Sequence, residues 1–103
     1  MRIDQFILQT KVYSCMYDFV QEYPDSPLSV RLIAESSDCS EQEIKTIFRE
    51  LRERKLLKRN GMLKHVYTLT HEGLQVVKEG WEDYNRFKQH EDDKNNRQNN
   101  VAS

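Results

Sequence analysis

The sequence contains few of the residues that mark specialised folds. Its 103 residues include two cysteines, two prolines and three glycines. Cys15 and Cys39 form no CxxC pair, so we expect neither a disulfide framework nor a zinc site and interpret both as small apolar residues. No run of about 18 apolar residues is present, which argues against a membrane-spanning helix.

Signals for export and patterns for catalysis are also lacking. Residues 1–4 do not begin a basic-then-apolar leader, so we expect a cytoplasmic protein with no membrane partner. His65, His71 and His90 have no metal-ligand spacing, and no activated nucleophile or carboxylate pair is recognisable. Because 103 residues at 37% hydrophobic content fill one modest core, we expect a binding module without cofactor or metal rather than an enzyme.

The charges are unevenly distributed along the chain. The net charge is −1, but residues 1–44 carry three basic and eight acidic side chains, or −5. Residues 45–65 carry eight basic and two acidic side chains, or +6, and the remainder carries −2. A basic stretch of this kind is typical of a surface that contacts nucleic acid.

The apolar periodicity predicts helices in the first half of the chain. A helix is expected from about Asp4 to Tyr23, where Pro24 ends it. A second helix is expected after Ser29, a plausible N-cap. A third begins after Ser40, because Ser40-Glu41-Gln42-Glu43 has the pattern of a capping box.

The second half of the chain predicts a hairpin and a last helix. Asn60-Gly61 between apolar-containing runs indicates a two-residue turn that pairs Arg59 with Met62 and Lys58 with Leu63. Thr70 is expected to cap the last helix. From residue 89 to 103 no apolar period remains, so a disordered polar tail is expected after a domain covering residues 1–88.

The expected order of elements is α-α-α-β-β-α, a mostly α fold with a small β-hairpin. With the motifs below, it resembles the winged helix-turn-helix of MarR-like and PadR-like regulators and the LexA-type DNA-binding domain. The resemblance is carried by Ile33-Ala34-Glu35 followed by Ser40 and Ile44, by Leu51 followed by Leu56-Leu57, and by Tyr67-Thr68-Leu69-Thr70-His71-Glu72-Gly73. The resemblance to LexA-type proteins covers their DNA-binding domain and not their protease domain, so we expect no self-cleavage from these 103 residues.

The sequence departs from this family pattern at three positions. Asp38 stands where the turn commonly has glycine, and Cys39 replaces a core leucine. Lys55 stands where a glycine commonly ends the recognition helix. Of these residues, Asp tolerates a left-handed backbone better than most but less well than glycine.

The resemblance implies a recognition helix over residues 41–54 in the major groove and a wing over residues 56–69 on the backbone or minor groove. Gln can read adenine, and Arg or Lys can read guanine or bind phosphate. The candidate DNA-binding residues are Ser40, Gln42, Lys45, Thr46, Arg49, Arg52, Lys58, Arg59, Asn60 and Lys64. The alternatives are a solvated helix face and edge strands whose cations discourage aggregation.

The terminal helices carry a broad apolar stripe that could bury a two-fold dimer interface. The candidate dimerisation residues are Leu8, Tyr13, Trp81, Tyr84 and Phe87. The alternative is that these side chains complete the core of one chain.

The sequence therefore predicts a homodimeric, sequence-specific regulator of double-stranded DNA acting as a repressor. The second hypothesis is a winged-helix module for protein interaction or replication assembly, whose basic face docks an acidic protein.

Overall fold

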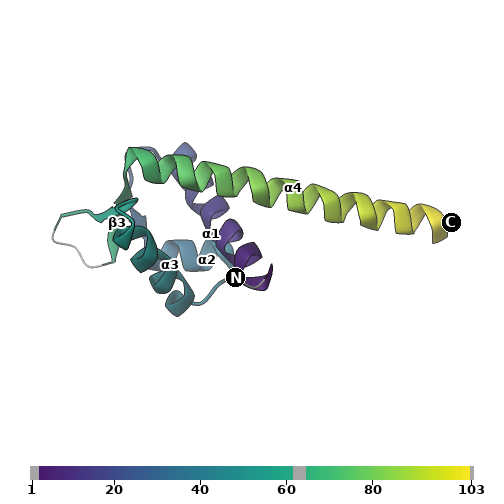
Figure 1. The fold of residues 1–103 in the computed structure, drawn as a ribbon, viewed down its shortest axis with the longest axis horizontal. Helices are drawn as coiled ribbons and strands as arrows, with labels where there is room; N and C mark the ends of the chain where they lie inside the picture. Colours follow the sequence, from purple (N-terminus) through teal and green to yellow (C-terminus); the bar gives the residue numbers. More distant parts are fainter. Residues whose placement is uncertain (1–2, 62–64, 103) are drawn as a thin grey trace.

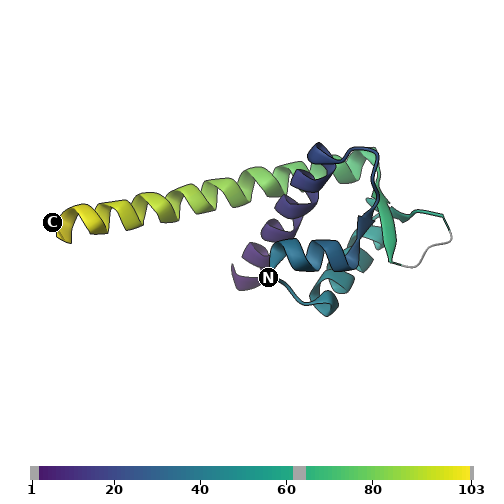
Figure 2. The same ribbon diagram turned by 180° about the vertical axis from the view of Figure 1, so that it is seen from behind.

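The chain is mostly helical, with one small antiparallel sheet (Figures 1 and 2). The computed structural model describes residues 3–61 and 65–102. Its elements in chain order are α1 (Ile3–Glu22), β1 (Leu28–Ser29), α2 (Val30–Ser37), α3 (Glu41–Glu53), β2 (Leu57–Arg59), β3 (Val66–Leu69) and α4 (His71–Ala102). The predicted helices are therefore present, and the predicted hairpin belongs to a three-stranded sheet.

The third strand, β1, is an element that the sequence did not predict. The sheet order is β1-β3-β2, and β1 pairs with β3 through Leu28 opposite Tyr67. A strand of two residues is too short for an alternating apolar pattern to reveal it. Its second residue, Ser29, is at the same time the N-cap of α2, so the local pattern favours a helix start.

The β2–β3 hairpin has a longer connection than the sequence predicted. The prediction of a two-residue turn at Asn60-Gly61 is wrong. Arg59 pairs with Tyr67, and the Asn60 N–H donates to the Val66 carbonyl at 2.9 Å. Met62, Leu63 and Lys64 lie outside the described residues. The observed register places buried Tyr67 edge-on against Phe48 of α3, with ring centroids 5.3 Å apart. Burial of this ring sets the register, whereas the turn residues alone favoured a shorter loop.

Three predicted helix caps are confirmed. The Ser29 hydroxyl accepts from the Leu32 N–H at 3.0 Å. At α3 the Ser40 hydroxyl accepts from the Glu43 N–H, while the Glu43 carboxylate accepts from the Ser40 N–H, both at 3.1 Å. The Thr70 hydroxyl accepts from the Gly73 N–H at 3.1 Å and so caps α4. These contacts satisfy backbone donors that a helix start otherwise leaves unpaired.

The turn between α2 and α3 depends on a left-handed residue. Asp38 ends α2 with φ 56° and ψ 40°. The following N–H, of Cys39, donates to the Ala34 carbonyl at 3.1 Å. Asp38 therefore occupies the backbone conformation for which glycine is the usual residue.

The core lies between the four helices and the sheet, and α4 contributes the buried Val77. The predicted buried stripe of α3 is confirmed, since Ile44, Ile47, Phe48 and Leu51 are all buried. Because this stripe occupies one side of α3, the polar side of the helix faces outward. The core therefore sets which residues of α3 are available to a partner.

The most extensive contact between two helices joins α1 to α4. A side chain on Gly80 would meet the Cβ of Tyr13 at 2.6 Å, so the two backbones approach closely here. One turn away, the rings of Tyr17 and Trp81 lie 5.3 Å apart. Tyr13 is only 6% exposed and belongs to the core of a single chain, which was the alternative to its predicted dimer role.

Helix α4 continues beyond the body of the fold (Figure 1). The sequence predicted a disordered tail from residue 89, but the structure continues the helix to Ala102. No glycine or proline, the two residues least favourable in a helix, interrupts residues 81–102. The absence of an apolar period shows only that the segment has no apolar face to pack against a core. It does not exclude a helix.

Close packing at Gly73 gives a stability prediction. A Cβ at this position would lie 1.9 Å from the Leu56 carbonyl oxygen. Alanine favours a helix by about 1 kcal/mol over glycine, but we expect the backbone clash to prevail. Gly73→Ala should lower the free energy of unfolding by about 2 kcal/mol, measured by urea denaturation.

The control is Gln75→Ala, an exposed site in the same helix, which should change the unfolding free energy by less than about 0.5 kcal/mol. A Gly73→Ala protein as stable as the parent would contradict the close approach of α4 to Leu56.

Candidate nucleic-acid interface

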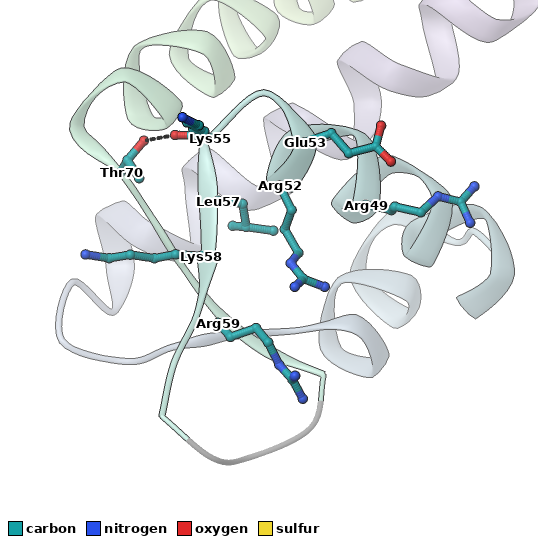
Figure 3. Close-up of a pocket in the computed structure, with 8 residues that line it drawn as sticks. All are labelled: Arg49, Arg52, Glu53, Lys55, Leu57, Lys58, Arg59 and Thr70. Atoms are coloured by element: carbon teal, nitrogen blue, oxygen red, sulfur yellow. Dashed lines mark hydrogen bonds between the residues drawn. The ribbon is translucent and has the colours of Figure 1, made fainter.

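Basic side chains gather around an open hollow between the end of α3 and β2 (Figure 3). The hollow has a volume of about 740 Å³. Its lining residues are Arg49, Arg52, Glu53, Lys55, Leu57, Lys58, Arg59 and Thr70. Four of these were predicted from the sequence as DNA-binding residues, so the fold brings part of the predicted set together.

Helix α3 and strand β2 point the basic side chains of the hollow in different directions. Arg49 and Arg52 are three residues apart on α3 and therefore project from neighbouring positions of one helix face. In Figure 3 the guanidinium groups of Arg52 and Arg59 point to the same side of the hairpin, whereas Lys58 extends to the other side. The hollow therefore presents its guanidinium groups on one side and Lys58 along the opposite edge.

Arg52 is held in place by the sheet. Its guanidinium carbon lies 5.7 Å from the centroid of the Tyr67 ring, within cation–π range. Tyr67 itself is fixed by its edge contact with Phe48, at an interplanar angle of 83°. The Arg52 head group is thus positioned by a buried β3 residue before any ligand is present.

Lys55 is the one basic lining residue of the hollow that was not predicted from the sequence. It follows the end of α3 with φ +60°, a left-handed conformation. The Thr70 hydroxyl donates to the Lys55 carbonyl at 3.2 Å and lies 3.2 Å from the Leu56 carbonyl. Its place directly after α3, within the basic stretch of residues 45–65 and where a glycine is common, was the signal that could have identified it.

The positive charge of the hollow is almost uncompensated. Glu53 supplies the one carboxylate among its lining residues. The ion pairs of the described chain are Arg31–Glu35 and Arg86–Asp83, neither of which involves the hollow. Like charges that converge without acidic partners favour a polyanionic ligand.

The rest of the predicted DNA-binding set lies elsewhere. Ser40 is engaged in the capping box, Lys45 is exposed on α3, and Asn60 is exposed next to Gly61. Lys64 is among the residues that the structure does not describe. Gln42 and Thr46 line a second, smaller groove. The predicted residues of α3 are therefore divided between two surfaces, with Arg49 and Arg52 at the basic hollow and Gln42 and Thr46 at the second groove.

This second groove separates α3 from the N-terminal turns of α1. Its volume is about 290 Å³. Its lining residues are Gln5, Leu8, Gln9, Gln42, Glu43, Thr46, Ile47 and Glu50. Leu8, a predicted dimerisation residue, lies in this groove.

A tyrosine hydroxyl lies near the groove, where Gln9 Nε2 donates to Tyr13 Oη at 2.6 Å. Burial raises the pKa of the Tyr13 phenol, and the contact with Gln9 and the nearby Arg54 partly oppose this shift. The phenol therefore stays neutral at physiological pH.

The two cysteines are half-buried thiols. Cys15 Sγ donates to the Ser36 carbonyl at 3.6 Å, and Cys39 Sγ donates to the Ser37 carbonyl at 3.5 Å. Burial raises the pKa of the Cys15 thiol, which lowers its thiolate fraction and hence its reactivity.

The remaining dimerisation candidates are partly accessible. Phe87 is 37% exposed, and Trp81 and Tyr84 are half-buried along α4. Phe6, near the start of α1, is 48% exposed. These aromatic side chains leave apolar surface that one copy of the chain does not cover.

Metal-ligand clusters and membrane-spanning helices are not found among the described residues. Within residues 3–61 and 65–102, no three His, Cys, Asp or Glu side chains converge as metal ligands. None of the described helices is long and apolar enough to cross a membrane. No protein-family model, curated protein or solved structure matches the chain. The features of the described chain that point to a ligand are therefore the geometry and charge of α3 and the hairpin.

The left-handed Lys55 gives a prediction for this interface. An L-residue pays about 1 kcal/mol for this conformation, and glycine does not. Lys55→Gly should therefore raise the free energy of unfolding by about 0.5 kcal/mol, after allowing for the larger entropy of the unfolded glycine chain.

Lys58→Gly is the matched comparison, because Lys58 lies in the extended strand β2. Lys58→Gly should lower the free energy of unfolding by about 0.5–1 kcal/mol. If urea denaturation shows both variants destabilised alike, the left-handed strain at Lys55 is contradicted.

Proposed function

We propose that this chain is a winged helix-turn-helix that binds double-stranded DNA. In this proposal α2, the Asp38 turn and α3 form the helix-turn-helix, and the β2–β3 hairpin is the wing. The observation that carries it is the hollow between α3 and β2, which gathers five cations around one carboxylate. A charge arrangement of this kind suits the regularly spaced phosphates of a duplex.

The proposed docking places the outer face of α3 in the major groove. Lys45 and Arg49 are exposed on this face and carry the donors that read guanine. Arg52, held against Tyr67, and Arg59 contact the phosphates beside the groove. Lys58 and Asn60 extend the contact along the hairpin toward the backbone or the minor groove.

We further propose that two copies act together as a repressor. The partly exposed Trp81, Tyr84 and Phe87 on α4 supply apolar surface for a two-fold contact. A dimer would present two copies of α3 to half-sites about one helical turn of DNA apart. Occupation of such a site would exclude other proteins from the same DNA.

One feature favours a second function, a module that assembles with other proteins. Residues 1–44 carry a net charge of −5, so this part of the chain could offer an acidic surface to a partner protein in addition to the basic hollow. Under this alternative the basic hollow binds an acidic protein, and duplex DNA of any sequence binds weakly.

The DNA proposal is tested by selecting bound duplexes from a random pool and titrating the recovered sequence at several salt concentrations. We expect log affinity to fall with log salt by about 0.9 for each phosphate contact. Arg49→Ala should reduce the free energy of binding to the selected sequence by about 1–3 kcal/mol and should reduce binding to random DNA by less. Lys58→Ala should weaken binding to the two kinds of duplex about equally.

Absence of duplex binding even at low salt would leave the protein-assembly alternative. An equal loss for Arg49→Ala on both duplexes would show that this residue contributes no specificity.

The dimer is tested by sedimentation of the whole chain at micromolar concentration. We expect a dimer that Phe87→Glu shifts toward monomer, because a carboxylate would be desolvated in the apolar contact. Gln89→Glu, about 200° away around α4 at 100° per residue, should leave the dimer intact. If the parent protein sediments as a monomer, the dimer is contradicted, and Trp81, Tyr84 and Phe87 belong to the packing of a single chain.

A further inference from the structure

The groove between α1 and α3 differs in chemistry from the basic hollow. Leu8 of α1 and Ile47 of α3 give it apolar lining. The side-chain amides of Gln5, Gln9 and Gln42 add polar groups around it. A volume of about 290 Å³ is close to the lower limit of about 300 Å³ for small-molecule sites. The groove therefore suits a compact ligand with an apolar body.

The charge of this groove is negative. Glu43 and Glu50 line it, and no Lys or Arg is among its lining residues in the part of the chain that the structure describes. Helical geometry explains the separation, because at 100° per residue Glu43 and Glu50 fall on the α1 side of α3. Arg49 and Arg52 fall on the outer face and the opposite side. Arg54 follows α3 near Tyr13 and does not line the groove, so the charged side chains that line the groove itself are both acidic.

The two carboxylates are not equally available. Glu43 Oε1 already accepts from the Ser40 backbone N–H at 3.1 Å and from its hydroxyl at 3.0 Å. The carboxylate of Glu50 has no hydrogen bond and no ion pair among the described residues, although its backbone carbonyl accepts from the Arg54 N–H. Gln9 uses an amide N–H to donate to Tyr13, so its carbonyl oxygen and those of Gln5 and Gln42 remain as further acceptors. A cation with more than one N–H can therefore pair with Glu50 and donate to an amide.

We propose that the α1–α3 groove binds a small organic cation, an amidinium or ammonium group on a compact apolar body. The apolar body packs against Leu8 and Ile47, and the charge lies at Glu50. Because Gln42 and Thr46 belong both to this groove and to the outer part of α3, the bound cation competes with DNA. This last step depends on the proposed DNA-binding function, whereas the binding of the cation does not.

The test uses the whole chain without DNA and titrates benzamidinium by calorimetry, with benzyl alcohol as the uncharged compound of similar body. Benzamidinium should bind and benzyl alcohol should not reach the same affinity. Glu50→Gln should weaken benzamidinium by about fivefold, the upper range for an exposed ion pair. Glu53→Gln, whose carboxylate lines the basic hollow instead, should leave the affinity unchanged.

Equal affinity for the two compounds, or an unchanged affinity in Glu50→Gln, would overturn the cation site. Amide NMR shifts confined to α4 or the hairpin would also overturn it, because the ligand would then lie elsewhere. A second titration measures duplex affinity with and without saturating benzamidinium. Unchanged duplex affinity would overturn the competition alone, and absence of duplex binding would refute the DNA proposal while leaving the calorimetric result intact.

Discussion

The Leu56 carbonyl is the point at which three elements of this fold are joined. It accepts from the Thr70 N–H at 3.0 Å, the Thr70 hydroxyl lies 3.2 Å away, and the Gly73 backbone approaches it closely enough to exclude a side chain. This contact fixes the end of α3, the start of β2 and the first turn of α4 relative to one another. The basic hollow exists because Lys55 and β2 are held beside α3 in this way.

The two sides of α3 have opposite charge for a physical reason. Burial of Ile44, Ile47, Phe48 and Leu51 fixes the rotation of the helix. That rotation turns Glu50 toward α1 and Arg52 toward the hairpin. One helix can therefore offer a surface for polyanions and a separate groove for cations, although its net charge is close to zero.

Local rules predicted many elements of the fold correctly. The capping box at Ser40, the caps at Ser29 and Thr70, and the buried stripe of α3 depend on residues a few positions apart, and all are observed. The hairpin turn and β1 were missed because their pairing depends on Tyr67, which contacts residues distant in the chain. The helical tail was missed because the polarity of a segment predicts the lack of a core, and does not predict the backbone conformation.

The sequence by itself determined where the helices begin, which side of α3 is buried and where the positive charge is concentrated, because each follows from short-range periodicity and composition. Tertiary structure decided which of those charges meet. It joined Arg52, Lys55 and Arg59 around one hollow and placed Gln42 and Thr46 against α1 instead. The physical reason is that hairpin register and helix packing are set by burial of Tyr67 and by the close approach of α4 at Gly73 and Gly80.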